Sequence, residues 1–214
     1  MTQQRVLNQA IYPGVGKGPL DDCWVLADLM GVHACAPWSW LVNVKDYRGV
    51  AGVPDTDTGS EGGGIAASAK GIRGLYPKLV IEVSDASLTW NEYVARIIAG
   101  HPASLHILSG KLPLALQHGY TGTHRVFHHF LAGMHYIGNP LAKAYSGCAG
   151  ITEAEIKAAA LGDTAKVRAL IFPTPAEAFT THPLYVPPAD CTAAVAAATG
   201  PLDARIAAAK IALG

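Results

Sequence analysis

The sequence lacks several features that would point to particular classes of protein. No apolar run approaches the roughly 18 residues of a membrane span, and no basic segment followed by an apolar one opens the chain. We therefore expect neither a membrane helix nor a signal peptide. Lysine plus arginine and aspartate plus glutamate both number 16, which gives a formal net charge of zero. This balance offers no electrostatic reason to expect a nucleic acid or an anionic membrane as partner.

Cysteine is also scarce. The four cysteines among 214 residues are widely spaced and form no CxxC motif. This spacing excludes a dense disulfide framework and a zinc knuckle, so the role of each cysteine depends on its own surroundings in the sequence. The glycine-rich stretch 59–64 lacks a GK[ST] ending and a preceding strand, and so does not predict a nucleotide site. We expect no metal or other cofactor.

Half of the residues are apolar, which is enough to bury a substantial core. A Gly/Pro-rich lead-in ends at Leu20, and Asp21 and Asp22 are natural N-cap and first-turn residues for a helix beginning at Cys23. Two further helices are expected over 39–53 and 64–76.

The pattern changes after the first third of the chain. Strands are expected over 78–83 and 103–108, followed by a pair formed by 124–138. Thr89 with Glu92, and Thr152 with Glu155, have the spacing of capping boxes that open helices. The order predicts an α+β domain with helices packed on a mostly antiparallel sheet.

Three segments are expected along the chain. Residues 1–172 form the domain, 173–188 read as a proline-rich connector, and 189–214 as an Ala-rich helical segment. The apolar residues of the last segment fall close to heptad spacing, which suits an interface between copies of the chain. The alternative is a helix that packs on its own domain.

Cys23 is the cysteine with a setting for chemistry. At a helix N-terminus, unpaired N–H groups and the helix dipole stabilise a thiolate and lower the pKa of the thiol. The alternative is a small buried hydrophobic residue, which we keep for Cys35, Cys148 and Cys191.

A thiolate nucleophile needs a base that is held by a third group. His124 opens an expected strand, and Asn139 follows its partner strand, so the two would lie at the same rim of the sheet. His128 and His129 are rivals for the base; strand alternation places His128 on the face of His124 and His129 on the other. The His124 and His128 spacing would suit zinc on a helix, but the stretch reads as strand and has no HExxH carboxylate.

These residues carry a resemblance. The stretches "DDCWVLADLMG", "YRGVAGVPDTDTGSEGGG", "GKLPLALQHGYTGTHRVFHHF" and "NPLA" resemble the papain-like cysteine peptidases of the bacteriocin-leader-processing type, and more narrowly their variants in lysins and virion tail proteins of phages that infect actinobacteria. The resemblance covers residues 5–160 approximately. It implies a papain-like fold, with Cys23 as nucleophile, His124 as base and Asn139 as the orienting group.

Two positions depart from the family pattern. Asn139 stands where the family has Asp, and an Asn carbonyl can equally accept from an imidazole N–H. The Gln that usually precedes the nucleophile has no close counterpart, so the oxyanion candidates are Gln9 and the start of the helix at Asp22 and Cys23.

Three further residues are candidates for substrate contact, namely His128, Trp24 and Tyr120. Trp24, like the other tryptophans, also reads as a core residue because it lies among apolar neighbours in an expected helix.

The resemblance implies a cysteine peptidase at the phage tail tip that cleaves amide bonds in peptidoglycan during entry, with other virion tail proteins as partners. The alternative is a structural tail protein or wall-binding module that keeps the fold without activity. A leader-peptide-processing protease is a third interpretation.

Overall fold

The computed structural model describes residue 7 and residues 22–37, 39, 41–53, 64–142, 147–161 and 165–180. The chain divides into two compact units, residues 1–179 and 180–214, and all described strands lie in the first. Gln9, the loop 54–63 and the expected C-terminal helical segment 189–214 lie outside the described residues.

A six-stranded antiparallel sheet forms the centre of the described fold, in the order β1-β6-β2-β3-β4-β5. The expectation of an α+β domain with a mostly antiparallel sheet is confirmed. The strands are β1 (Glu82–Leu88), β2 (Ala103–Leu108), β3 (Thr123–Leu131), β4 (Met134–Gly138), β5 (Ala149–Ile151) and β6 (Val167–Ile171).

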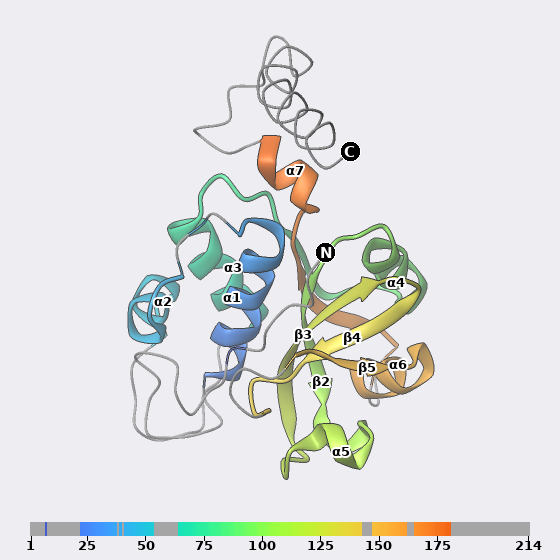
Figure 1. The fold of residues 1–214 in the computed structure, drawn as a ribbon. Coiled ribbons are helices and arrows are strands. Elements are labelled where there is room, and N and C mark those ends of the chain that lie inside the picture. Colours follow the sequence, from blue (N-terminus) through green and yellow to red (C-terminus); the bar gives the residue numbers. More distant parts are fainter. Residues whose placement is uncertain are drawn as a thin grey trace, which may run out of the picture. The chain divides into compact units, whose positions relative to one another are not determined.

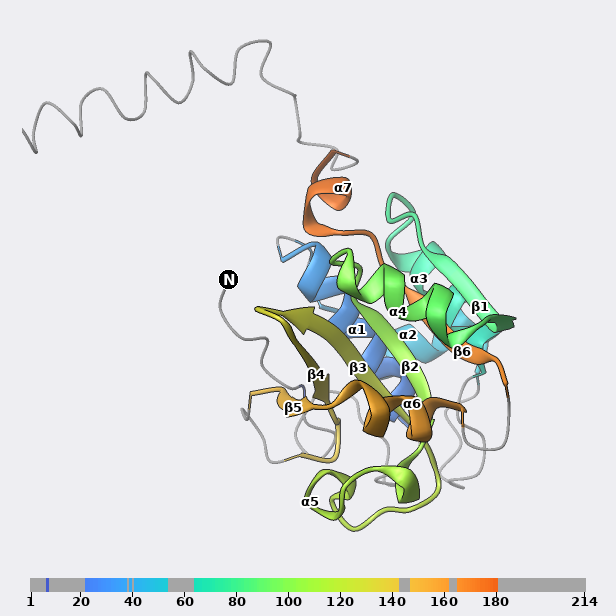
Figure 2. The same cartoon turned by 90° about the vertical axis from the view of Figure 1, so that its right-hand side faces the viewer.

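Helices cover both faces of this sheet (Figures 1 and 2). On one face lie α1 (Cys23–Cys35), α2 (Val44–Ala51) and α3 (Ile65–Leu75); on the other lie α4 (Trp90–Ile98) and α6 (Glu153–Leu161). The β2–β3 connection contains the short η1 (Ser109–Lys111) and α5 (Leu114–Gln117), and α7 (Pro175–Thr180) follows β6. None of the helices among the described residues is long and apolar enough to cross a membrane.

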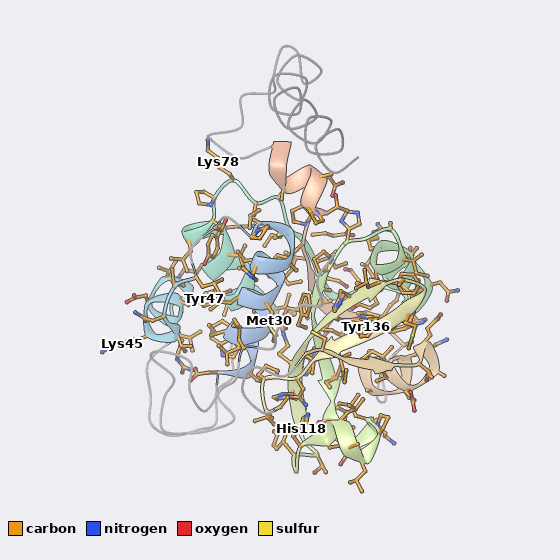
Figure 3. All side chains as sticks on the ribbon, viewed as in Figure 1. Met30, Lys45, Tyr47, Lys78, His118 and Tyr136 are labelled. Atoms are coloured by element: carbon orange, nitrogen blue, oxygen red, sulfur yellow. The ribbon has the colours of Figure 1, made fainter. Side chains whose placement is uncertain are left out.

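Helix α1 is the central helix of its layer. Eleven of its thirteen residues are buried, so it has no solvent-facing stripe, as expected for a helix enclosed by protein on all sides. It packs against α2, α3 and strand β3, and its Met30 joins Phe127 of β3 in a cluster bordered by Tyr136 of β4 (Figure 3). This packing fixes the first residue of α1, Cys23, relative to the sheet.

The two capping boxes are confirmed. Thr89 Oγ1 accepts the N–H of Glu92 at 3.4 Å and the Glu92 carboxylate accepts the N–H of Thr89 at 2.8 Å. Thr152 and Glu155 make the same pair of bonds at the start of α6. Each box satisfies backbone donors that the helix itself leaves unpaired.

Several elements differ from expectation. Strand β1 begins at Glu82 rather than at 78, because its ladder is set by pairing with β6 and by Ser84, whose hydroxyl donates to the Val167 carbonyl at 2.7 Å. Strands β5 and β6, of three and five residues, were not expected. The start of the expected connector 173–188 is helical as α7, with Ala178 packed into the core.

Candidate functional site

Cys23 is the first residue of α1, and Asp22 occupies the N-cap position. The Asp22 side chain makes no capping hydrogen bond; its carboxylate instead pairs with Arg48 Nη1 of α2 at 2.8 Å, and both side chains are buried. Asp22 therefore occupies the expected N-cap position, but its side chain makes no capping hydrogen bond. The pairing holds the entrance of α1 against α2.

The Cys23 thiol is buried, with 6% of the residue exposed. Burial raises the pKa of the thiol to about 11, and the negative charge of Asp22 acts in the same direction. The backbone N–H of Arg125, the charge of its guanidinium and the N–H of Trp24 oppose this shift. The lowered pKa expected for a helix N-terminus is thus reversed, because desolvation disfavours the thiolate more than the local donors favour it.

The N–H of Arg125 that faces the Cys23 thiol belongs to strand β3. His124 is the preceding residue of this strand. The start of α1 and the start of β3 both lie toward the end of the molecule that carries α5 (Figures 1 and 2). The fold therefore brings the Cys23 thiol to the backbone N–H of the residue that follows the expected base, although the His124 ring itself makes no described hydrogen bond to the thiol.

Asn139 lies directly after β4 and is paired with His124, whose Nε2 is 2.8 Å from Asn139 Oδ1. The orientation of the amide is fixed by two other bonds: Oδ1 accepts the Leu141 N–H at 2.9 Å, and Nδ2 donates to the Leu116 carbonyl at 2.9 Å. Because Oδ1 is an acceptor, Nε2 carries the proton and Nδ1 of the neutral ring has the lone pair.

Nδ1 of His124 is buried and has no hydrogen-bond partner among the described residues, Cys23 included. Burial lowers the pKa of His124 to about 4, an effect that His118 and His106 reinforce and the bond to Asn139 opposes. The imidazole is therefore neutral at pH 7, and its unprotonated nitrogen is available to accept a proton. Tyr120 lies edge-on to this ring with 5.7 Å between the ring centroids.

His128 lies away from this arrangement. Its Nδ1 is 2.7 Å from Tyr93 Oη of α4, and its Nε2 is 3.1 Å from His135 Nδ1 of β4. The residue is fully buried, so contact with a substrate would require the sheet layer to open. The stretch that contains His124 and His128 is a strand, which removes the helical spacing required by the zinc alternative.

The other candidates have different surroundings. Trp24 is 1% exposed and packs edge-on against Tyr47 in the core, so it does not reach solvent where a substrate would bind. Tyr120 is partly exposed beside His124, and its hydroxyl donates to the Thr123 carbonyl at 3.1 Å. Gln9 lies outside the described residues. Among the described residues, no group of three or more His, Cys, Asp or Glu side chains is arranged to hold a metal ion.

Sequence reasoning missed Arg125 and Asp28. Both are buried, and Arg125 Nη2 lies 3.4 Å from Asp28 Oδ1 of α1. The indication in the sequence was an arginine directly before the apolar pair Val126 and Phe127 inside an expected strand. A charge at such a position must be paired, but its partner is 97 residues away in the chain.

Comparison with protein-family models and with curated proteins gives no match. Among solved structures, the fold is similar to a crystal structure from Bacillus anthracis whose protein is assigned as a C39-like peptidase. The TM-score is 0.48 and the sequence identity 13%, over 79% of this chain and 98% of that chain. The chemistry of the present site follows from its own residues.

Proposed function

We propose that this chain is a papain-like cysteine peptidase with Cys23 as nucleophile, His124 as proton carrier and Asn139 as the orienting residue. The observation that carries the proposal is the state of His124. One ring nitrogen is held by Asn139 at 2.8 Å, while the other is buried without a described partner. The backbone N–H of the next residue along the strand, Arg125, faces the Cys23 thiol. A base held by a third group beside a nucleophile is the arrangement that acyl transfer requires.

The raised pKa of Cys23 and the lowered pKa of His124 favour a neutral thiol and a neutral imidazole at rest. In the proposed reaction, the thiol proton passes to His124 Nδ1 as Sγ attacks the amide carbonyl carbon. His124 then gives this proton to the departing amine as the C–N bond breaks. Water, deprotonated by His124, hydrolyses the thioester and releases the acid and Cys23.

His124 Nδ1 makes no hydrogen bond to the Cys23 thiol in this structure. We expect Sγ and Nδ1 to approach each other when substrate binds, because catalytic hydrogen bonds often tighten only in the enzyme–substrate complex. The backbone N–H groups at the start of α1 are the donors for the oxyanion. The Asp22 carboxylate accepts hydrogen bonds and is paired with Arg48, so it cannot itself be a donor there. Gln9 stays a candidate for the second donor.

The substrate and setting come from the sequence motifs. We take the substrate to be an amide bond in a peptide of peptidoglycan, cleaved at the phage tail tip during entry, with other tail proteins as partners. The resemblance of "DDCW", "YTGTHRV" and "NPL" to phage wall enzymes supports this assignment.

The test is release of new amino groups from purified actinobacterial cell wall, detected by mass spectrometry. Wild-type protein should release them and Cys23→Ala should not. Cys35→Ala, at the other end of the same helix, is the matched control and should retain activity once its thermal unfolding shows that it is folded. Equal release by wild type and Cys23→Ala would contradict the proposal.

A second candidate function is a scaffold or wall-binding module that keeps the fold without catalysis. The observation that favours it is the burial of the Cys23 thiol, with its pKa raised to about 11. On this alternative, Cys23→Ala leaves both wall binding and particle assembly unchanged, and wild-type protein releases no amino groups. Infectivity of particles carrying the variant separates the two functions.

A further inference from the structure

The Arg125 guanidinium is buried between the sheet and the helices on its α1 face. Its Nη2 donates to Ser68 Oγ of α3 at 2.9 Å and lies 3.4 Å from Asp28 Oδ1 of α1. Its Nε donates to Ser104 Oγ of β2 at 3.3 Å. One side chain of β3 is therefore bonded to two helices and to a neighbouring strand.

The other oxygen of Asp28 is also occupied. Tyr47 Oη of α2 lies 2.8 Å from Asp28 Oδ2 and 3.1 Å from the Ser68 carbonyl oxygen. All of these groups are buried, and each described bond satisfies a polar atom that would be costly to leave unpaired. The network fixes α1 in place against α2, α3 and the sheet.

Stability alone is a weak reason for such a network. A buried ion pair often stabilises a fold no more than well-packed apolar side chains of the same size. The location of this pair is more informative. Asp28 lies on the helix that begins with Cys23, and Arg125 follows His124 and presents its own N–H to the Cys23 thiol.

We propose that Arg125 and Asp28 are a positioning pair that holds the nucleophile helix α1 and the base strand β3 in a fixed position relative to each other. This inference rests on the proposed function. It adds two residues whose side chains act by positioning Cys23 and His124 and not by contact with substrate or reacting atoms.

The charges around Cys23 predict the direction in which its pKa should change when Arg125 is replaced. Arg125 lowers the pKa of the thiol through both its N–H and its charge, whereas Asp22, which pairs with Arg48, raises it. On the side of His124, the charges of His118 and His106 disfavour its protonated form, and Tyr120 lies edge-on to its ring. Removing the Arg125 charge should therefore raise the pKa of Cys23 further, which a merely structural residue would not do.

The experiment measures the alkylation rate of Cys23 by iodoacetamide between pH 7 and 11, read by mass spectrometry, in folded variants of the full chain. Arg125→Met should slow alkylation at pH 8 about threefold to tenfold, since each unit of pKa changes the thiolate fraction tenfold. Arg125→Lys should restore the rate because it keeps the charge. Arg96→Met, which removes an arginine from the exposed pair with Glu82, is the matched control and should leave the rate unchanged.

Arg125→Met leaves Asp28 buried and unpaired, which can prevent folding. The double variant Asp28→Asn with Arg125→Met removes both charges and carries the same test, with the same slowing expected. A folded variant of either kind with the wild-type alkylation profile overturns the positioning role.

Hydrolysis separates this inference from the proposed function. Arg125→Lys keeps the charge but not the geometry of the bonds to Ser68 and Ser104, so kcat should fall with KM little changed. Wild-type protein that cleaves no wall peptide overturns the proposed function. Wild-type protein that cleaves normally while Arg125→Lys has the same kcat overturns the positioning role alone.

Discussion

His128 Nε2 of β3 lies 3.1 Å from His135 Nδ1 of β4, and both residues are buried. The hydroxyl of Tyr93 lies 2.7 Å from the other nitrogen of His128. With both rings neutral, Tyr93 donates to His128 Nδ1 and His128 donates from Nε2 to His135. A proton added to His128 Nδ1 would break the hydrogen bond from the Tyr93 hydroxyl, because that nitrogen could no longer accept it.

We predict that this chain of side chains makes the fold sensitive to acid. Burial lowers the pKa of His128 well below its usual value, and it lowers that of His135 as well. The unfolded chain therefore binds more protons below pH 6.5, so the stabilisation is present above that pH and is lost as the pH falls toward the folded-state pKa values. The free energy of unfolding in urea should fall by at least about 1 kcal/mol between pH 7 and 5.

The control for this prediction is a variant of the chain itself. His128→Gln should be less stable at pH 7 but show a smaller loss on acidification, because one buried group no longer titrates. A wild-type stability that is flat from pH 7 to 5 would contradict the account.

Asn139 provides the second prediction. Asn139→Ala removes the acceptor that holds His124 Nε2, so the ring loses its tautomer and orientation, and kcat should fall by about 10²- to 10⁴-fold. Asn139→Asp keeps an acceptor and adds a negative charge, which should raise the pKa of His124 above about 4 and preserve activity. The pKa is measured by NMR titration of the imidazole and the activity by wall digestion. An unchanged kcat in a folded Asn139→Ala variant would remove Asn139 from the site.

The pH dependence of the site gives the third prediction. Because the pKa of Cys23 is raised to about 11, its alkylation rate in the free protein should keep rising up to about pH 11, whereas the rate of an ordinary thiol levels off once the pH is well above its pKa of about 8.5. Cys35 and Cys148, whose pKa values burial raises to about 12, should react still more slowly. A plateau in the Cys23 rate by pH 7 would instead indicate a resting thiolate–imidazolium pair.

The acid limb of hydrolysis tests the same site from the other side. His124 must be neutral to accept the thiol proton, and its pKa is lowered to about 4. Activity should therefore persist at pH 5 in the folded fraction and fall near pH 4. A midpoint near pH 6.5 for the loss of activity would show that burial in the substrate-free protein does not set the pKa of His124.

Local patterns in the sequence were sufficient for part of this structure. The capping pairs, the start of α1 at Cys23 and the strand pair that brings His124 to Asn139 depend on residues close together in the chain, and strand alternation and turn residues describe such contacts well. His128 shares the strand of His124, yet four residues of strand span about 13 Å, which is enough to place it in a different environment.

The parts that could not be predicted depend on distant partners. The Arg125 charge is accommodated by Asp28 and Ser68, which are 97 and 57 residues away in the sequence, and no local pattern encodes that pairing. Strand β6 has five residues, and its place between β1 and β2 depends on the pairing of both neighbours. The raised pKa of Cys23 likewise follows from burial by the assembled fold, which outweighs the local effect of the helix N-terminus.

Gly31 gives a final prediction about the helix that carries the nucleophile. A Cβ added at this position of α1 would overlap the Phe172 ring, which is itself fully buried. Gly31→Ala should therefore destabilise the fold by about 1–3 kcal/mol through overpacking, although alanine is normally the better helix residue. Gly49→Ala in α2 is the matched control: nothing lies within 4 Å of its added Cβ, so it should stabilise the fold by about 0.5–1 kcal/mol. Urea unfolding of both variants checks the pair, and a stabilised Gly31→Ala protein would show that α1 is not packed against Phe172 as described.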